Sequence, residues 1–295
     1  MGNQFDSFVL YEDSISVKAL SHAKINLFLR VIGKRTDGYH ELVTLLCLIS
    51  LCDTISLKFG IDNISISCDD PNVPDDYTNL AYKAAAVFFK AFSYEKGVDI
   101  FIEKKIPVGA GLGGGSSNAA TVLCALNRFF SYPFSRDYLM SLGLSIGADV
   151  PFFIFGQPAL ATGIGEKLQF FKGLDKFYVL IIFPGFSIST SMVYKNFNLG
   201  LTKSKKKNIN NFVNIKKFDG KSHVVNDLET VTLSNFPEVL RAKRVLVDNG
   251  AIGVLMSGSG SSVFGLYSDL KNAMRAKKTI PKTKNWRIFI AEMLV

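Results

Sequence analysis

Five glycines and two serines between Pro107 and Asn118 form the segment of this chain with the clearest chemical meaning. Glycine has no Cβ, so backbone N–H groups can curl toward one point and an anion can approach them closely. A helical pattern over residues 116–130 follows directly, and its N-terminus would aim free N–H groups and about half a positive charge at that point. The segment therefore predicts a phosphate-binding loop made by Pro107, Gly109, Gly111, Gly113, Gly114, Gly115, Ser116 and Ser117.

Two common kinds of phosphate loop do not fit this segment. No Gly-Lys-Ser/Thr closes the glycine run, so the P-loop pattern fails. The dinucleotide-binding pattern is also weakened, because no acidic residue ends a following strand at the expected distance. A flexible Gly/Ser linker is a poor alternative, since the run joins the strand-like residues 98–103 to an Ala/Leu-rich helix without a polar spacer.

Asp149 is a candidate for proton transfer beside a bound phosphate. Phosphoryl transfer needs phosphates held, charge offset and an acceptor hydroxyl aimed in line. Asp149 stands in Gly147-Ala-Asp-Val-Pro151, where it can point into a cleft and accept the hydroxyl proton. An isolated Asp before an apolar run also commonly caps a helix or turn. The spacing leaves both interpretations open.

Lys24 and Asn26 are a second candidate pair, on a strand whose alternate positions are apolar. With Ile25 and Leu27 on one face, Lys24 and Asn26 share the other face and could both line a site. The alternative is a lysine on the solvated face of an antiparallel sheet.

A polar loop at Gly33–Glu41 offers the aromatic ring of Tyr39 and the ring nitrogens of His40. Stacking on one and hydrogen bonding to the other would suit a nucleobase. An ordinary surface turn is the alternative for this loop.

These candidates are placed by a mixture of short strands and helices. The periodicity predicts strands at 14–20, 23–32, 42–51, 54–59, 63–68, 98–103, 177–183 and 286–293, with a strand, a Ser257–Gly260 turn and a returning strand over 251–267. It predicts helices at 79–92, 116–130, 136–144, 191–197, 226–248 with a break at Pro237, and 270–277. This order predicts an α+β protein of two domains, 1–155 and 156–295, with a cleft between them.

The bulk composition predicts an ordered protein with an anionic partner. Hydrophobic residues make up 48% and charged residues 20%, and the net charge is +9 at pH 7. Much of that charge lies in the lysine-rich segment 198–222, which has no aromatic alternation for stacking bases and is typical of a solvated loop. Four cysteines without zinc spacing, no signal-peptide pattern and no apolar run near 20 residues predict a cytoplasmic protein with no membrane partner.

Three motifs resemble those of the GHMP small-molecule kinases. They are Ala23-Lys-Ile-Asn-Leu27, Pro107-Val-Gly-Ala-Gly-Leu-Gly-Gly-Gly-Ser-Ser117 and Ser257-Gly-Ser-Gly-Ser-Ser-Val263. The resemblance extends from about residue 20 to residue 264. It implies an N-terminal domain like domain 2 of ribosomal protein S5 and a ferredoxin-like C-terminal domain. Further matches at 34–42, 147–153, 163–167 and 226–229 resemble the branch that phosphorylates a cytidine diphosphate-linked erythritol in the non-mevalonate isoprenoid route.

The resemblance also implies roles for individual residues. ATP would give its γ-phosphate to the 2-hydroxyl of the erythritol, with Asp149 taking the hydroxyl proton and Lys24 offsetting charge beside it. The remaining substrate-binding residues would be Asn26 at the acceptor, Tyr39, His40 and Tyr194 at the cytosine, and Thr190, Gly258, Ser259 and Gly260 from the C-terminal domain.

For the nucleotide, the resemblance implies Asn79 and Leu80 in the adenine pocket, with Lys104 near it. Mg²⁺ would bridge the phosphates, with Ser116 or Ser117 as a ligand. His22 departs from the family pattern, which has Pro at that position.

Two rival functions follow from the same residues. The net charge and the S5-like half would fit a nucleic-acid-binding module. Nucleic-acid binding, however, gives no reason for an ordered glycine loop and Asp149. A GHMP kinase for homoserine, mevalonate or a sugar would have no base to stack on Tyr39 and His40. We expect a small-molecule kinase with no nucleic-acid partner, monomeric or weakly dimeric.

Overall fold

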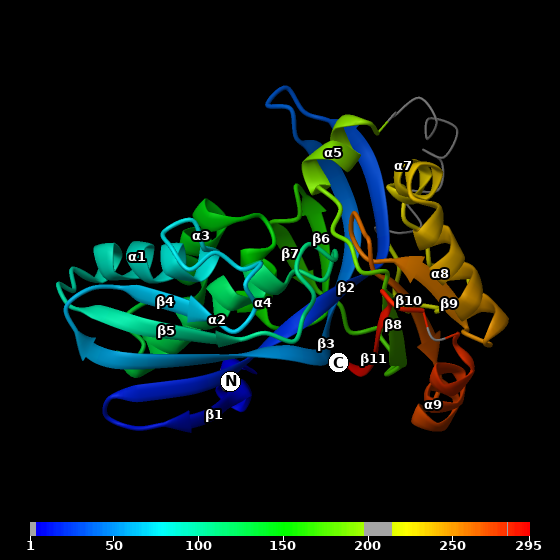
Figure 1. Cartoon of the computed structure of the whole chain (residues 1–295). Coiled ribbons are helices and arrows are strands. Elements are labelled where there is room, and N and C mark those ends of the chain that lie inside the picture. Colours follow the sequence, from blue (N-terminus) through cyan, green and yellow to red (C-terminus); the bar gives the residue numbers. More distant parts are fainter. Residues whose placement is uncertain (1–3, 198–213, 282) are drawn as a thin grey trace. The chain divides into compact units, whose positions relative to one another are not determined.

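The computed structural model describes residues 4–197, 214–281 and 283–295 (Figure 1). Its strands are β1 (Val9–Glu12), β2 (Ser16–Lys34), β3 (His40–Ile61), β4 (Ser65–Cys68), β5 (Gly97–Glu103), β6 (Ala159–Gly163), β7 (Lys167–Phe170), β8 (Tyr178–Phe183), β9 (Gly253–Met256), β10 (Val263–Tyr267) and β11 (Arg287–Leu294). Its α-helices are α1 (Leu80–Phe92), α2 (Gly114–Phe129), α3 (Arg136–Ile146), α4 (Val150–Phe155), α5 (Thr190–Lys195), α7 (Glu229–Asn235), α8 (Pro237–Asp248) and α9 (Leu270–Thr279), after a 3₁₀ turn at Gln4–Phe8.

The chain divides into two compact units that are not consecutive in sequence. The first comprises Met1–Ala23, Cys52–Val108 and Gly113–Gln157, and the second comprises Lys24–Leu51, Gly109–Leu112 and Pro158–Val295. Both β2 and β3 therefore contribute residues to each unit, as does the glycine run. The domain boundary expected at residues 155 and 156 stays a prediction.

In the first unit, helices cover one face of a small sheet (Figure 1). The end of β3 pairs antiparallel with β5, and β5 pairs parallel with β4. Against them pack α1 and α2, whose facing residues include Ala84, Ala85, Ala119 and Ala120, all nearly inaccessible. Small side chains let the two helices approach closely, so α2 is held firmly along its length. The packing of α1 against α2 thus supports the position of the start of α2.

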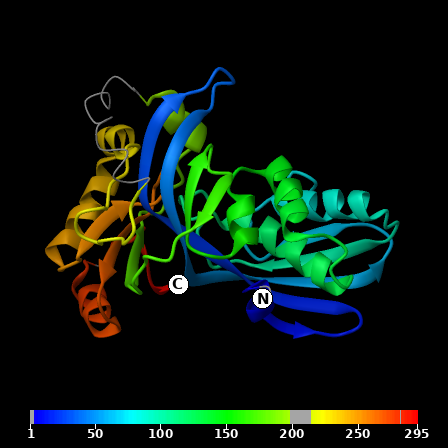
Figure 2. The same cartoon turned by 180° about the vertical axis from the view of Figure 1, so that it is seen from behind.

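The second unit contains a ferredoxin-like sheet, as the resemblance implies. Its strand order is β11-β8-β10-β9 and every neighbouring pair is antiparallel. The central strand β8 is buried on both faces, and α8 and α9 cover one of them (Figure 2). At the other side, β11 pairs with β3 at Ile49 and β3 pairs with β6 along Leu42–Leu46.

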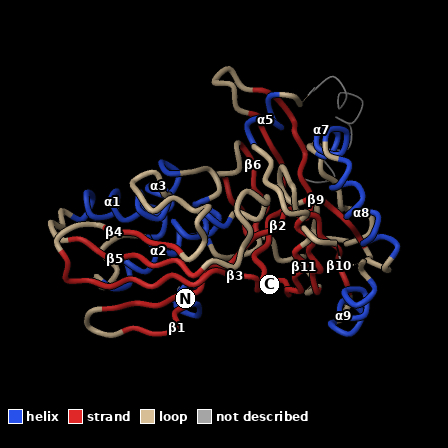
Figure 3. The backbone as a smooth tube through the Cα atoms, in the orientation of Figure 1, coloured by secondary structure: helices blue, strands red, loops and turns tan. Residues whose placement is uncertain are grey.

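The strands β2 and β3 are longer than the sequence pattern predicts. Residues 14–20 and 23–32 were expected as separate strands, but β2 runs continuously over 19 residues. Residues 42–51 and 54–59 likewise merge into β3, with 22 residues (Figure 3). The polar residues at the expected breaks stay in the strands because they are bonded: Ser21 contacts Ser117 Oγ at 2.8 Å, and Asp53 accepts from several donors. Buried polar groups with partners do not interrupt a strand.

Other differences concern helix ends and short elements. Pro237 breaks the long helix expected at 226–248 as predicted, ending α7 at Asn235 and standing at the first position of α8. The short strands β1, β6 and β7 and the six-residue α4 have no counterpart in the expectations. Most of the lysine-rich segment, including Lys203 to Lys207, lies outside the described residues.

Candidate active site

The start of α2, in the first unit, has the backbone features that the predicted phosphate-binding loop requires. Gly113 precedes the helix in the left-handed region, with φ of +74°, and no side chain of the described residues caps the first turn. Its free N–H groups are therefore left for a ligand. A Cβ added to Gly114 would lie 2.9 Å from Lys104 Nζ, and one added to Gly115 would lie 3.6 Å from Leu80 Cδ1. The structure thus brings Leu80 and Lys104 to the glycine run.

Asn79 caps α1, and Pro107 is buried at the beginning of the glycine run. The Asn79 side chain caps α1 by accepting from the Ala81 N–H, and its amide donates to the Pro74 carbonyl at 2.7 Å. Both ends of the side chain are therefore used locally, and Asn79 supports the position of Leu80. Pro107 is buried between Ile106 and the glycine run. Their contact with a nucleotide stays a prediction.

The two serines at the start of α2 differ in their surroundings. Ser117 is 1% exposed and its Oγ donates to the His22 carbonyl at 2.6 Å. Ser116 is half-buried, and its Oγ forms no hydrogen bond with any described residue. Of the two hydroxyls that the sequence left open, only that of Ser116 is available to a ligand.

Asp149 lies immediately before α4, on a turn that runs beside this helix start. A Cβ added to Gly147 would lie 3.9 Å from Ser116 Oγ, so the Gly147–Asp149 turn is next to the first turn of α2. Asp149 is half-buried, and its side chain makes no capping hydrogen bond to α4. Capping of this helix, the alternative left open by the sequence, is therefore wrong for the Asp149 side chain.

Lys24 and Asn26 form a buried pair on β2, in the second unit. They are 5% and 3% exposed, and Lys24 Nζ donates to Asn26 Oδ1 at 2.8 Å. Asn26 Nδ2 donates to Thr44 Oγ1, which in turn donates to the Phe28 carbonyl. This chain fixes which way the Asn26 amide faces. The alternative of a solvated lysine is wrong, because Lys24 is buried. A buried ammonium requires polar partners such as Asn26.

Two glycine turns meet beside this pair within the second unit. Gly111 has φ of +77°, and a Cβ there would lie 2.1 Å from the Ser257 carbonyl oxygen. Ser257 Oγ donates to the Gly111 carbonyl at 2.9 Å. A Cβ added to Gly258 would lie 3.5 Å from Asn26 Oδ1 and 3.6 Å from Lys24 Nζ. The backbone of the third motif is therefore next to the buried lysine.

Asn226 holds that third motif, a role that the sequence analysis did not recognise. Its Nδ2 donates to the carbonyl oxygens of Met256 and Gly258, at 2.9 Å and 2.7 Å. The following residue, Asp227, accepts from Arg30 and from the Val31 N–H, which are on β2. One short segment thus supports both the glycine turn and the strand of Lys24. An Asn-Asp pair at the start of the helical pattern predicted over 226–248 was the available signal.

The predicted base-binding residues separate into a stacked pair and an exposed ring. His40 is 8% exposed and stacks on Tyr194, with ring centroids 5.3 Å apart. Burial, with a smaller contribution from Lys34, lowers the pKa of His40, so its imidazole is neutral at pH 7. Tyr39 is 59% exposed, on the solvent side of its turn. Thr190 Oγ1 and Ser259 Oγ lie 2.8 Å apart, so those two predicted residues do come together.

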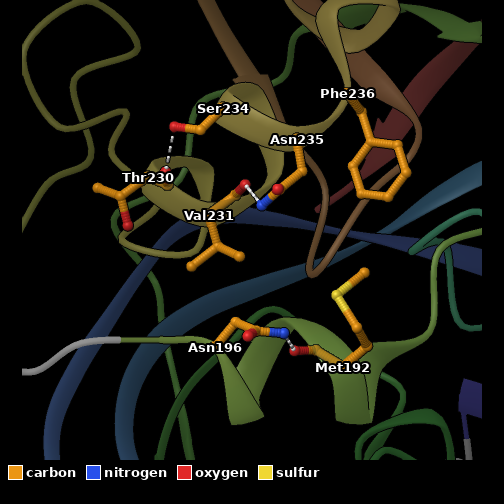
Figure 4. A pocket seen from close by; sticks show the side chains of 7 residues that line it. All are labelled: Met192, Asn196, Thr230, Val231, Ser234, Asn235 and Phe236. Carbon is orange, nitrogen blue, oxygen red and sulfur yellow. Dashed lines mark hydrogen bonds between the residues drawn. The ribbon is translucent and has the colours of Figure 1, made fainter.

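A separate cavity of about 460 Å³ lies between α5 and α7 (Figure 4). Its lining contains none of the predicted site residues: Met192, Asn196, Thr230, Val231, Ser234, Asn235 and Phe236. The amide groups of Asn196 and Asn235 donate to the carbonyls of Met192 and Val231, four residues earlier in each case. These amide donors are thus already engaged, and nothing in the lining indicates phosphate chemistry.

Within the described residues, no three His, Cys, Asp or Glu side chains are grouped so that they could hold a metal ion. Among the same residues, no helix combines the length and apolar character needed to cross a bilayer.

The comparisons with known proteins agree with this geometry. The model of the GHMP kinases N terminal domain matches residues 79–157, and that of the GHMP kinases C terminal domain matches residues 205–284. The chain belongs to the GHMP kinase family and is a small-molecule kinase. The resemblance seen in the sequence is thereby confirmed, as is the two-domain α+β fold.

Individual relatives narrow the family further. A 4-diphosphocytidyl-2-C-methyl-D-erythritol kinase of Syntrophotalea carbinolica is 46% identical over 92% of this chain and 97% of its own length. The crystal structure of a 4-(cytidine 5'-diphospho)-2C-methyl-D-erythritol kinase matches with a TM-score of 0.77 at 34% identity, covering 94% of this chain and 98% of that one. A homoserine kinase from Cytophaga hutchinsonii, at 19% identity and a TM-score of 0.69, covers 97% of both chains and shares the fold.

Proposed function

We propose that the chain transfers the γ-phosphate of ATP to the 2-hydroxyl of 4-diphosphocytidyl-2-C-methyl-D-erythritol, giving the 2-phosphate and ADP. The observation that carries the reaction type is the meeting of Gly111 and Gly258 beside the buried Lys24–Asn26 pair. The identity of the acceptor is supported by relatives of that name at 41–46% identity and by the His40–Tyr194 stack. The product belongs to non-mevalonate isoprenoid synthesis, and we place the reaction in the cytoplasm.

The nucleotide would be held by the backbone at the start of α2. The N–H groups of Gly114, Gly115 and Ser116 are in the uncapped first turn of α2, and the Lys104 ammonium lies beside them. Leu80 would pack against the adenine. Because these groups are fixed before ATP arrives, they bind its phosphates without reorganising.

Asp149 would act as the general base and Lys24 as the charge stabiliser. The carboxylate accepts the proton of the 2-hydroxyl as its oxygen bonds to the γ-phosphorus. The bond from the γ-phosphorus to the bridging oxygen breaks, and ADP leaves with the electron pair. The proton passes from Asp149 to solvent. Lys24 offsets charge on the transferred group, while Asn26, with its amide direction fixed by Thr44, orients the acceptor.

The residues present fit a Mg²⁺ ion that is carried mainly by the nucleotide. Mg²⁺ usually keeps several waters and binds through substrate phosphates with few protein ligands. The Ser116 hydroxyl would be its protein ligand. The ion would supply positive charge that offsets the negative charge of the phosphates.

The cytosine would lie against the His40–Tyr194 stack. A neutral imidazole has one ring nitrogen to donate and one to accept, which suits the mixed donor and acceptor edge of cytosine. Thr190, Ser259 and Gly260 would contact the acceptor from the same unit. Tyr39 is exposed on its turn and is not part of this stack, so we expect it to make the smaller contribution to binding the base.

An acceptor panel tests the proposal. Purified chain, Mg·ATP and equal concentrations of the cytidyl substrate, homoserine, mevalonate and galactose are compared by ADP release. Phosphorus NMR then locates the new phosphomonoester. We expect turnover of the cytidyl substrate alone, with a phosphate on its 2-oxygen. Faster turnover of any other alcohol, or a phosphate at another position, would overturn the assignment.

A further inference from the structure

A buried carboxylate outside the predicted site lies at the base of the glycine run. Asp53 is in β3, and its side chain is 0% exposed. Its Oδ1 accepts from the N–H groups of Lys105 and Ile106, both at 2.8 Å. Its Oδ2 accepts from Lys104 Nζ at 2.5 Å and from Asn118 Nδ2 at 2.9 Å. Both oxygens are therefore used twice, which offsets the cost of burying the charge.

The four donors flank the glycine run on its two sides. Residues 104–106 come before the run, and Asn118 is close to the start of the helix after it. One carboxylate thus fixes where the loop begins and where α2 begins. All of these groups are in the first unit.

Asp53 also decides where the Lys104 ammonium lies. Lys104 Nζ is next to Gly114, the first residue of α2, and its side chain is 5% exposed. A cation at the N-terminus of a helix is unfavourable for the helix itself, because the helix dipole is positive there. The carboxylate of Asp53 compensates this repulsion and keeps the ammonium beside the free N–H groups.

A chain of hydrogen bonds extends the same network to β2. Asn118 Nδ2 also donates to Ser21 Oγ, which contacts Ser117 Oγ at 2.8 Å. The first turn of α2 is therefore tied to two strands through buried side chains.

We propose that Asp53 is a positioning residue for the nucleotide, holding the Lys104 ammonium and the first-turn N–H groups of α2 in the geometry that binds phosphate. The proposal rests on the proposed ATP site at this loop and extends it to a residue that does not touch ATP. Loss of Asp53 should weaken nucleotide binding and leave the binding of the acceptor alcohol unchanged.

The test compares Asp53→Asn with Asp62→Asn. Asp62 pairs with Lys96 at 2.6 Å in the same unit, but both side chains are largely exposed. The amide introduced at position 53 would replace one of the two carboxylate oxygens by an N–H₂ group. The two donors that bonded to that oxygen would then have no acceptor. We expect the KM for ATP and the Kd for Mg·ADP to rise at least about tenfold in Asp53→Asn. The KM for the acceptor at saturating ATP should stay within about twofold, and Asp62→Asn should match the wild type.

A double variant separates positioning from general stability. Asp53→Asn alone leaves the Lys104 ammonium buried without its carboxylate, and that can lower Tm or prevent folding. Asp53→Asn with Lys104→Met removes the unpaired charge, so Tm should recover while the Kd for Mg·ADP stays above that of Lys104→Met alone. A double variant whose Kd equals that of Lys104→Met would overturn the proposal, as would an unchanged Kd in a folded Asp53→Asn variant. Because ADP binding is measured without an acceptor, the result does not depend on which alcohol the enzyme uses.

Discussion

The start of α2 and the surroundings of Lys24 offer different groups to the ligands that we propose for them. At α2 those groups are backbone N–H groups, and the charges beside them, Lys104 and Asp53, are paired and buried. Around Lys24 the groups are side chains, with Asn26 oriented by Thr44 and two glycine turns packed alongside. Backbone groups recognise any triphosphate, whereas side chains can select one alcohol. We therefore expect substitutions in the two regions to affect different substrates.

Replacing Asp149 gives the largest effect we expect on turnover. Asp149→Asn keeps the shape but removes the proton acceptor, so kcat should fall by about 10² or more while the KM for ATP changes little. Steady-state kinetics with both substrates varied measures this. Asp137→Asn, at an exposed acidic residue in the first turn of α3, is the matched control. A kcat within about threefold of the wild type would remove Asp149 from the role of base.

Gly111→Ala tests whether the two glycine turns need their close contact. Its added Cβ would meet the Ser257 carbonyl at 2.1 Å, and φ of +77° is itself strained for alanine. Gly250→Ala is a close control, because Gly250 has φ of +76° but nothing within 4 Å of an added Cβ. Each carries a strain of about 1–3 kcal/mol.

Chemical denaturation measures the difference between these two variants. We expect Gly111→Ala to lose at least about 2 kcal/mol more free energy of unfolding than Gly250→Ala, because backbone atoms must move apart. Equal losses would show that the turns tolerate a wider spacing than the structure has.

Much of the fold follows from patterns that a sequence displays directly. The glycine run before an Ala-rich helix located the start of α2 within two residues, and Pro237 marked the break between α7 and α8. The continuous strands could not be predicted, because Asp53 and Ser21 look like strand breakers until their partners are known. Those partners are distant in sequence: Asp53 bonds Asn118, 65 residues away.

The candidate site divides in the same manner. Lys24 and Asn26 were found because period-two alternation puts them on one face, and their hydrogen bond confirms that they share it. Asp53 and Asn226 were missed because each supports backbone rather than facing a substrate. Their only sequence signal is a polar residue within or beside an apolar run, which is also typical of ordinary caps and turns.

Replacing the two tyrosines of the predicted base site should give unequal effects. Tyr194 stacks on His40, whereas Tyr39 is 59% exposed. Base–aromatic stacking contributes about 1–3 kcal/mol, so Tyr194→Ala should raise the KM for the cytidyl substrate by roughly 5- to 150-fold. Tyr39→Ala should raise the same KM by a smaller factor. An effect of Tyr39→Ala exceeding that of Tyr194→Ala would relocate the base to the exposed ring.

The smallest effect we expect is a dependence on pH through His40. Its pKa is lowered in the folded state, chiefly by burial, so the unfolded chain binds the proton more readily. The resulting stability is present above the usual histidine pKa of about 6.5 and is lost as the pH falls through the lowered folded value. Thermal unfolding at about pH 7.5 and about pH 5.5 should show a smaller loss of Tm in His40→Gln than in the wild type. His223→Gln, which replaces a histidine outside the stack, should keep the wild-type difference; equal behaviour of the two variants would contradict this.

Measuring both Michaelis constants in Lys104→Met and in Tyr194→Ala tests most directly whether the start of α2 and the side chains proposed to bind the acceptor recognise different substrates. Lys104 lies at the start of α2, and Tyr194 lies in the His40 stack. We predict that Lys104→Met raises the KM for ATP at least about fivefold with the KM for the cytidyl substrate nearly unchanged, and that Tyr194→Ala does the reverse. A crossed result, or a parallel rise of both constants in either variant, would contradict the division between a backbone-built nucleotide site and a side-chain-built acceptor site.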